Sequence, residues 1–208
     1  MYLPFDVDDL RKRVRAGEVF SYRHFYGHTP RKDGRLSNAV FSQFHQCRFE
    51  VDGQVYRWAE QWMMAGKARL FDDEGSLQKI MAARSAQDCK QLGREVANYD
   101  DTRWSDARFD LVTQGSAAKF GQDVALKDYL LATGDELLVE AAPQDRIWGI
   151  GLDRDDPDAS NPLAWHGLNL LGFALVRARS VLRGELQSSR HAAGGVLGPC
   201  AAATGSPG

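Results

Sequence analysis

The sequence has few of the residues that mark disulfide-rich or metal-binding proteins. Its 208 residues include only three cysteines, Cys47, Cys89 and Cys200, an odd number without the short spacing of a metal-binding motif. A disulfide framework is therefore not expected, and reduced thiols in a cytoplasmic protein are the simpler interpretation. The five histidines are scattered without paired-ligand spacing, so we expect no metal site.

The sequence also has no large net charge and no long hydrophobic run. A formal net charge of -2 supplies no overall field that would attract nucleic acid or an anionic membrane. No apolar run approaches the length of a membrane span, and the start of the sequence is too polar for a secretory signal. A P-loop, a nucleophile elbow and a basic-aromatic stripe are all missing. We expect a cytoplasmic protein with no cofactor and no membrane partner.

The length favours one well-buried core, because two full domains would be cramped in 208 residues. We predict a charged N-terminal arm over 1–19 and a single domain over 20–186. Residues 187–208 are mostly Gly, Ala, Ser and Pro, which is typical of a disordered tail. The expected fold class is mainly α with a small antiparallel β-sheet (α+β).

A small antiparallel sheet is predicted within Val19 to Tyr56, where short aromatic-rich runs are broken by glycines and Pro30. Phe49 to Tyr56 alternates apolar and polar residues around Asp52-Gly53, a good signal for a β-hairpin. Leu137 to Ala141 is short and apolar, and we expect it to be a strand that pairs with the early sheet. Asp153 to Ala164 is acidic and contains two prolines, which indicates an exposed loop.

Helices are predicted between and after these strands. Ser85 and Asp88 have the spacing of a capping box and predict a helix start, and Gly134 suits a left-handed helix end. In the last helix, three arginines are expected to point outward: Arg177, Arg179 and Arg183. Hydrophobic periodicity places the helices over 59–70, 76–83, 88–98, 104–120, 124–132 and 169–186.

The helix over 59–70 contains the most informative pair of residues. Glu60 and Lys67 are seven positions apart, two helical turns with only about 20° of drift, so both point to the same side. A surface salt bridge is the ordinary interpretation of such a pair. Trp58, Trp62 and Met63 leave little solvated surface, however, and buried ionisable groups are costly unless paired or used. Burial would raise the pKa of the acid and lower that of the amine, towards values useful in catalysis.

A second cluster follows the predicted strand over 137–141. Asp145 stands in a segment after a turn, where functional loops are common, although a role as a turn or cap residue is the commoner one. Trp148 is either a core residue or an aromatic wall. Gly149 and Gly151 would let the backbone approach a flat ligand closely.

Arg94 follows a glycine inside a predicted helix. Its guanidinium has the planar fork that binds phosphate, and an ordinary structural ion pair is an alternative use.

Taken together, these segments resemble the NADAR family, the YbiA-like N-glycosidases. The resemblance covers about residues 20 to 184, in order and at plausible spacing. Each motif alone is modest, and the ordered series is specific. The motifs include Phe25-Tyr26-Gly27-His28, Phe41-Ser42-Gln43-Phe44, the run from Ala59 to Ala68, Leu92-Gly93-Arg94, Leu138-Val139-Glu140-Ala141, the run from Asp145 to Gly151, and the run from Trp165 to Gly172.

The resemblance implies a mainly helical single domain that cleaves an N-glycosidic bond to ribose. Family substrates include phosphorylated ribosylamino-pyrimidines of riboflavin synthesis and ADP-ribose attached to guanine bases. The implied roles, by motif, are acid–base carboxylates at Glu60 and Asp145, an amine near the anomeric carbon at Lys67, aromatic walls at Trp104 and Trp148, backbone approach at Gly149, phosphate binding at Arg94 and a bracing amide at Asn169.

Three other functions stay open at this stage. The first is an enzyme of the same fold that acts on ADP-ribosylated nucleic acid, which no strong basic stripe favours. The second is a module that binds ADP-ribose or NAD without cleaving it, for which an acid, an amine and a second acid would not all be needed. The third is a purely structural helical protein. The sequence gives no signal of oligomeric state.

Overall fold

The computed structural model describes residues 3–184, so the predicted tail over 187–208 lies outside the described part. In chain order the elements are α1 (Val7–Arg15), β1 (Tyr22–Phe25), the 3-10 helix η1 (Asn38–Phe41), β2 (Phe49–Val51), β3 (Gln54–Tyr56), α2 (Ala59–Leu70), α3 (Glu74–Ala82), α4 (Ala86–Arg94), α5 (Asp101–Gly121), α6 (Val124–Leu131), β4 (Leu137–Glu140) and α7 (Leu170–Leu182).

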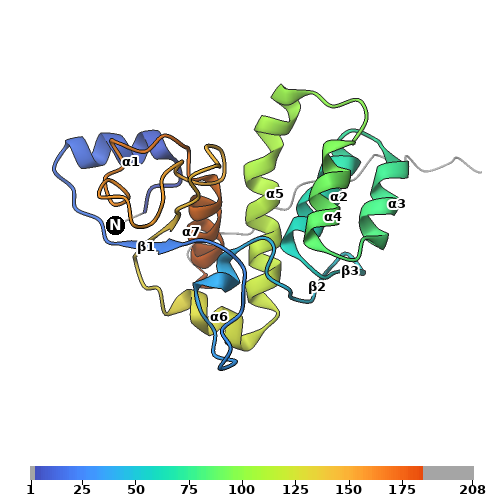
Figure 1. The fold of residues 1–208 in the computed structure, drawn as a ribbon, viewed down its shortest axis with the longest axis horizontal. Coiled ribbons are helices and arrows are strands. Elements are labelled where there is room, and N and C mark those ends of the chain that lie inside the picture. The colour runs from blue at the N-terminus through green and yellow to red at the C-terminus, as the bar shows by residue number, and fades with distance from the viewer. Residues whose placement is uncertain (1–2, 185–208) are drawn as a thin grey trace, which may run out of the picture.

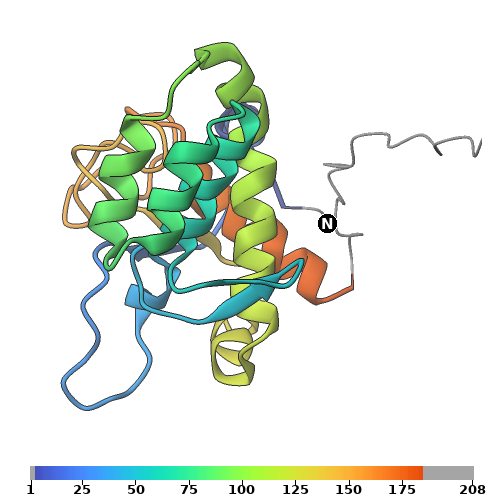
Figure 2. The same ribbon diagram turned by 90° about the vertical axis from the view of Figure 1, so that its right-hand side faces the viewer.

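Helices α5 and α7 pack against each other at the centre of the molecule (Figure 1). Helices α2, α3 and α4 form a group on one side of α5, with the β2–β3 hairpin below them. Helix α1, strand β1 and the chain over 150–168 lie on the other side, next to α7 (Figures 1 and 2). The two groups therefore meet along the α5–α7 pair.

The strands form two separate pairs. The predicted hairpin is confirmed, with Phe49 opposite Tyr56 in the antiparallel pair β2–β3. The strand over 137–141 pairs with the early region of the chain as predicted, since β4 lies beside β1 with Tyr22 next to Leu137, but this pair is parallel and separate from the antiparallel hairpin. Parallel strands need a long crossover, which α2 to α6 provide here. Residues Leu137 to Val139 are fully buried, as is usual for parallel strands.

Most predicted helix boundaries lie within two residues of the observed ones; α5 begins at Asp101, before the predicted start at 104, and α7 ends at Leu182, before the predicted end at 186. Ser85 caps α4 as the capping box predicts, its hydroxyl oxygen accepting from the Asp88 N–H at 3.0 Å, and Gly134 has the expected positive φ of 56°. The predicted end of that helix at Asn98 is wrong. The helix stops at Arg94, and Asn98 itself takes a left-handed conformation with φ of 55°.

The outward orientation predicted for Arg179 is wrong as well. Its side chain is 0% exposed and donates a hydrogen bond to the hydroxyl of Thr133 at 2.5 Å. The physical reason is that neighbouring elements cover α7 on almost every side, so the position of Arg179 lies in the core and not at the surface. Arg177 and Arg183 are half-buried and form ion pairs with Asp110 and Asp135.

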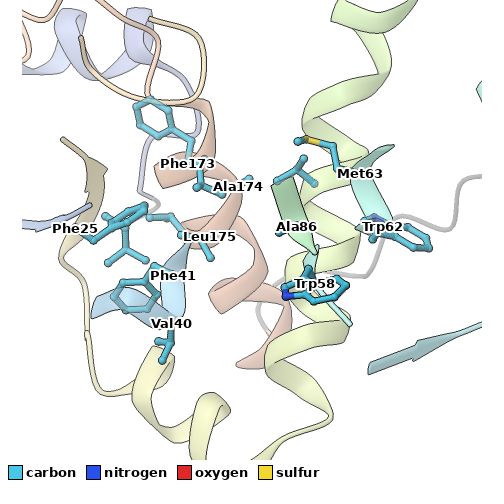
Figure 3. Packing of buried hydrophobic residues seen from close by; sticks show 14 of the residues in the cluster. Phe25, Val40, Phe41, Trp58, Trp62, Met63, Ala86, Phe173, Ala174 and Leu175 are labelled. Carbon is cyan, nitrogen blue, oxygen red and sulfur yellow. The ribbon is translucent and has the colours of Figure 1, made fainter. Parts of the chain in front are cut away.

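A continuous hydrophobic core joins the two groups of elements. Figure 3 shows Phe25, Phe41 and Leu175 together near α7, and Trp58 and Met63 in a second group next to α5. Helix α1 contributes Val7 and Leu10 to this core. Within residues 3–184, no helix is both long enough and apolar enough to cross a membrane.

Candidate active site

A cavity of about 370 Å³ opens between α2, α4, the first turn of α5 and the chain that follows β4. Six of the eight predicted site residues line it: Glu60, Lys67, Arg94, Trp104, Asp145 and Trp148. Two larger hollows, about 550 Å³ beside the hairpin and about 450 Å³ beside β1, have no buried carboxyl group among the described residues that line them. The cavity with the predicted residues is therefore the candidate site.

Glu60 projects into this cavity from the first turn of α2 and is only 3% exposed. Its backbone N–H donates to the carbonyl of Gln43 at 3.0 Å, which ties the start of α2 to the neighbouring wall. Burial raises the pKa of Glu60 to about 7, with a further increase from the charge of Asp145, against the opposing charges of Lys90 and Arg94. At neutral pH this acid is therefore poised to give or take a proton.

Lys67 lies two turns further along α2, on the same side of the helix. Its ammonium donates to the carbonyl of Gly93 at 2.8 Å and lies 4.3 Å from the ring centre of Tyr99. The ring centre of Trp104 is 5.7 Å away. Burial lowers the pKa of Lys67, so the reactive neutral amine is easier to reach than in water.

The salt bridge considered for Glu60 and Lys67 is not formed. Among residues 3–184, neither side chain belongs to an ion pair. The charges of Lys90 and Arg94 act on Glu60 from a distance, and the Lys67 ammonium faces aromatic rings and not a carboxylate.

Asp145 reaches the cavity from the turn after β4. One of its carboxylate oxygens, Oδ1, accepts from the backbone N–H groups of Ile147 and Trp148 at 2.9 and 2.8 Å. Asp145 is therefore both the turn residue of the ordinary interpretation and part of the cavity wall. The two hydrogen bonds fix the orientation of its carboxylate.

The sequence motifs include a third carboxyl group whose place in the site was not predicted. Glu140 is the last residue of β4 and lines the same cavity. Burial, followed by the charges of Asp145 and Glu60, raises the pKa of Glu140 to about 8, while Lys90 opposes the shift. Its Oε2 atom is buried without a hydrogen-bond partner. The available signal was an acid at the end of an otherwise apolar strand.

Lys90 is the second residue that sequence reasoning missed. It lies on α4 one turn before Arg94, and its amine is 5.6 Å from the ring centre of Phe44. Lys90 and Arg94 place two positive charges beside the three acids. Among residues 3–184, no cluster of His, Cys, Asp and Glu side chains is arranged to hold a metal ion.

Gly149 and Asn169 do not line the cavity but lie behind it. A Cβ atom at Gly149 would come within 2.8 Å of the carbonyl oxygen of Glu140, so only glycine allows this close packing against β4. The buried Asn169 amide accepts from the Glu140 N–H at 2.9 Å and donates to the Leu138 carbonyl at 3.0 Å. The structure therefore places both residues where they support the wall that Glu140 forms.

Comparison with known proteins identifies the family. The sequence model of the protein family described as the NADAR domain matches residues 24–183 of this chain. This chain belongs to the NADAR family. One relative is an N-glycosidase of Acanthamoeba polyphaga mimivirus, 39% identical over 167 residues that cover 78% of this chain and 96% of that protein. Another is the N-glycosidase YbiA of Escherichia coli, 28% identical over 142 residues, with 68% of this chain and 80% of that protein covered.

Two further comparisons add a longer relative and a solved structure. A riboflavin biosynthesis protein of Vibrio vulnificus is 29% identical over 84% of this NADAR chain, which aligns with 41% of that longer protein. The NMR structure of E. coli YbiA superposes with a TM-score of 0.60 at 23% identity, covering 92% of this chain and all of that one. The predicted YbiA-like α+β fold is thereby confirmed.

Proposed function

We infer that the chain is an N-glycosidase, a hydrolase that cleaves the bond between C1 of a ribose or phosphoribose and the nitrogen of a base or amine. The observation that carries this inference is the meeting of Glu60, Lys67 and Asp145 at one cavity of about 370 Å³. The site has the size expected for a small-molecule pocket. Relatives that are named N-glycosidases, aligned over most of their length, support the same reaction class.

The reaction starts with loss of the base or amine from C1, through a transition state with oxocarbenium character. The electron pair of the C1–N bond leaves with the nitrogen, which takes a proton from a carboxyl group of the cavity. Glu60 and Asp145 are the acid–base groups in this scheme. A base with a pKa near 7, such as Glu60, is well suited to accept a proton from water at neutral pH.

Lys67 forms a covalent intermediate in this proposal. Its neutral amine attacks C1 of the sugar and loses one proton; the bond between C1 and the ring oxygen then breaks as that oxygen gains a proton, which gives a protonated imine of the open-chain sugar. Water then hydrolyses the imine and returns the free amine. The lowered pKa of Lys67 supports this step, because an ammonium group has no electron pair to donate.

The remaining cavity residues hold the substrate. Trp104 and Trp148 provide flat surfaces against which a base can stack, and Arg94 faces the cavity from the end of α4, where it can bind phosphate. The proposed substrate class is a ribosylamino-pyrimidine phosphate. A relative named as a riboflavin biosynthesis protein supports this choice.

A small panel of substrates tests the proposal. Purified protein is incubated with a ribosylamino-pyrimidine 5-phosphate, an ADP-ribosylated guanine oligonucleotide and free ADP-ribose, and the products are identified by mass spectrometry. Release of ribose 5-phosphate supports the proposed substrate class. Release of ADP-ribose from the oligonucleotide would replace it with the nucleic-acid substrate, and binding without product would favour the non-catalytic module.

A further inference from the structure

The third acid of the cavity, Glu140, has no role in the reaction proposed above. It stands on the wall formed by β4, whereas Glu60 enters from α2 and Asp145 from the turn after β4. The charged groups that face it are Asp145, Glu60 and Lys90. Arg94 and Lys67 line the same cavity. Burial first, and then two acids and one nearby cation, determine whether Glu140 is charged.

The backbone of Glu140 is held on both sides. Its N–H donates to the amide of Asn169 at 2.9 Å, and its carbonyl accepts from the N–H groups of Ala142 and Ile150, both at 2.9 Å. A Cβ atom at Gly149 would collide with that carbonyl. The backbone from which the Glu140 side chain projects is therefore fixed in the cavity wall.

The surroundings of the Glu140 side chain favour its protonated form. Its Oε2 is buried and has no hydrogen-bond partner, and an ionised carboxylate oxygen in that condition is costly. The chain turns back after β4, with the Asp145 N–H donating to the Ala142 carbonyl at 3.2 Å, so the Asp145 carboxylate comes close enough to raise the pKa of Glu140. A nearby negative charge opposes ionisation of a second carboxyl group, so the charge of Asp145 favours the protonated form of Glu140.

We propose that Glu140 is a third catalytic residue, the acid that protonates the leaving nitrogen from its place in the β4 wall of the cavity. This proposal rests on the N-glycosidase reaction described above. The proton of Glu140 passes to the nitrogen as the C1–N bond breaks. The water that hydrolyses the sugar adduct later loses a proton, which returns to Glu140, so the cycle closes without another reactant.

The test compares a substrate that needs a proton donor with one that does not. The first probe is a ribosylamino-pyrimidine 5-phosphate, whose amine leaves poorly without protonation. The second is 4-nitrophenyl ribofuranoside 5-phosphate, whose nitrophenolate leaves unaided. Glu140→Gln keeps the size of the side chain and removes the acid. We expect the variant to lose 10²- to 10⁴-fold in kcat on the first probe and less than about 10-fold on the second.

The pH profile supplies a second readout that does not depend on any variant. In the wild-type protein, kcat/KM on the first probe should fall as the pH rises through about 8, where the acid loses its proton. On the nitrophenyl probe this fall should be absent.

Glu136→Gln is the matched control for Glu140→Gln, because this acid lies next to β4 and pairs with Arg23 outside the cavity. It should leave both profiles unchanged.

Several outcomes would overturn the donor role. They are an equal loss of Glu140→Gln activity on both probes, full activity of that variant on the first probe, or the same high-pH fall on both probes in the wild type. Each would do so while leaving the N-glycosidase reaction in place. A wild-type protein that cleaves neither probe would instead overturn the proposed function itself.

Discussion

The ammonium group of Lys67 is bound by the backbone carbonyl of Gly93, 2.8 Å away, and not by the carboxylate of Glu60 on the same face of the helix. A carbonyl can accept from a neutral amine as well as from an ammonium, whereas a carboxylate partner would favour the charged form. The lysine is therefore held in place without a carboxylate that would strongly favour its charged form.

Replacement of this amine should remove the covalent route. Lys67→Met keeps the length and the apolar character of the side chain, and we expect at least a 10³-fold loss of turnover on a ribosylamino-pyrimidine phosphate, since no nucleophile remains. Borohydride added during turnover should trap a sugar adduct on wild-type Lys67, visible by mass spectrometry. Lys79→Met on α3, which is exposed and outside the cavity, is the control. Full activity of Lys67→Met would rule out the imine.

Glu60 should make stability depend on pH. Its pKa rises from an ordinary 4.5 to about 7 on folding, so the folded protein binds more protons than the unfolded chain between these values. The free energy of unfolding therefore falls as the pH rises through this window. Glu60→Gln should raise the free energy of unfolding by about 3 kcal/mol at pH 8 and leave it almost unchanged at pH 4.

The same Glu60→Gln variant should lose 10²- to 10⁴-fold in turnover, because its side chain no longer exchanges a proton. Urea unfolding at both pH values and a steady-state assay check the two parts of this prediction. Glu95→Gln, an exposed acid just after α4, is a suitable control. A variant that is both fully active and no more stable at pH 8 would contradict the importance of Glu60.

Arg94 should affect the affinity for phosphate and not the stability. It is exposed at the end of α4 and takes part in no ion pair among residues 3–184. A charge-assisted contact to phosphate contributes about 1.5–3 kcal/mol, so Arg94→Ala should raise KM about 10- to 100-fold for a 5-phosphate substrate. The KM for the same riboside without phosphate should hardly change. Arg84→Ala, before α4, provides the comparison; equal effects of both variants would count against a phosphate site.

Asn169 should matter for stability and activity together. This residue is 0% exposed, has a left-handed φ of 53°, and bridges Leu138 and Glu140 with its side-chain amide. Asn169→Gly tolerates the backbone conformation but leaves two buried polar groups without partners, at about 1–3 kcal/mol each. We expect a clear loss of stability in chemical denaturation and a lower kcat. A loss of less than 0.5 kcal/mol, by the same scale, would show that the bridge is dispensable.

Local patterns account for the features that were predicted correctly. The hairpin at Asp52-Gly53, the capped start of α4 at Ser85 and the left-handed Gly134 each depend on a few neighbouring residues. The shared face of Glu60 and Lys67 follows in the same way from helical geometry alone. The positions of Asp145 and Trp148 at the cavity followed only from the family resemblance, because no local rule relates them to α2.

The features that were predicted wrongly or missed depend on contacts between residues far apart in the chain. The burial of Arg179 depends on which elements surround α7, and the parallel partner of β4 lies more than one hundred residues earlier in the chain. Glu140 was present in a quoted motif, yet its importance arises from the approach of Asp145 and Glu60 from other elements.

The amino-acid sequence alone determined the helices, the hairpin and the family of this protein, because these depend on short-range spacing and on ordered motifs. Only the tertiary structure decided which side chains lose water together. Desolvation and charge–charge interaction act through space, so the raised pKa values of Glu60 and Glu140 and the lowered pKa of Lys67 exist only once α2, α4 and β4 enclose one cavity.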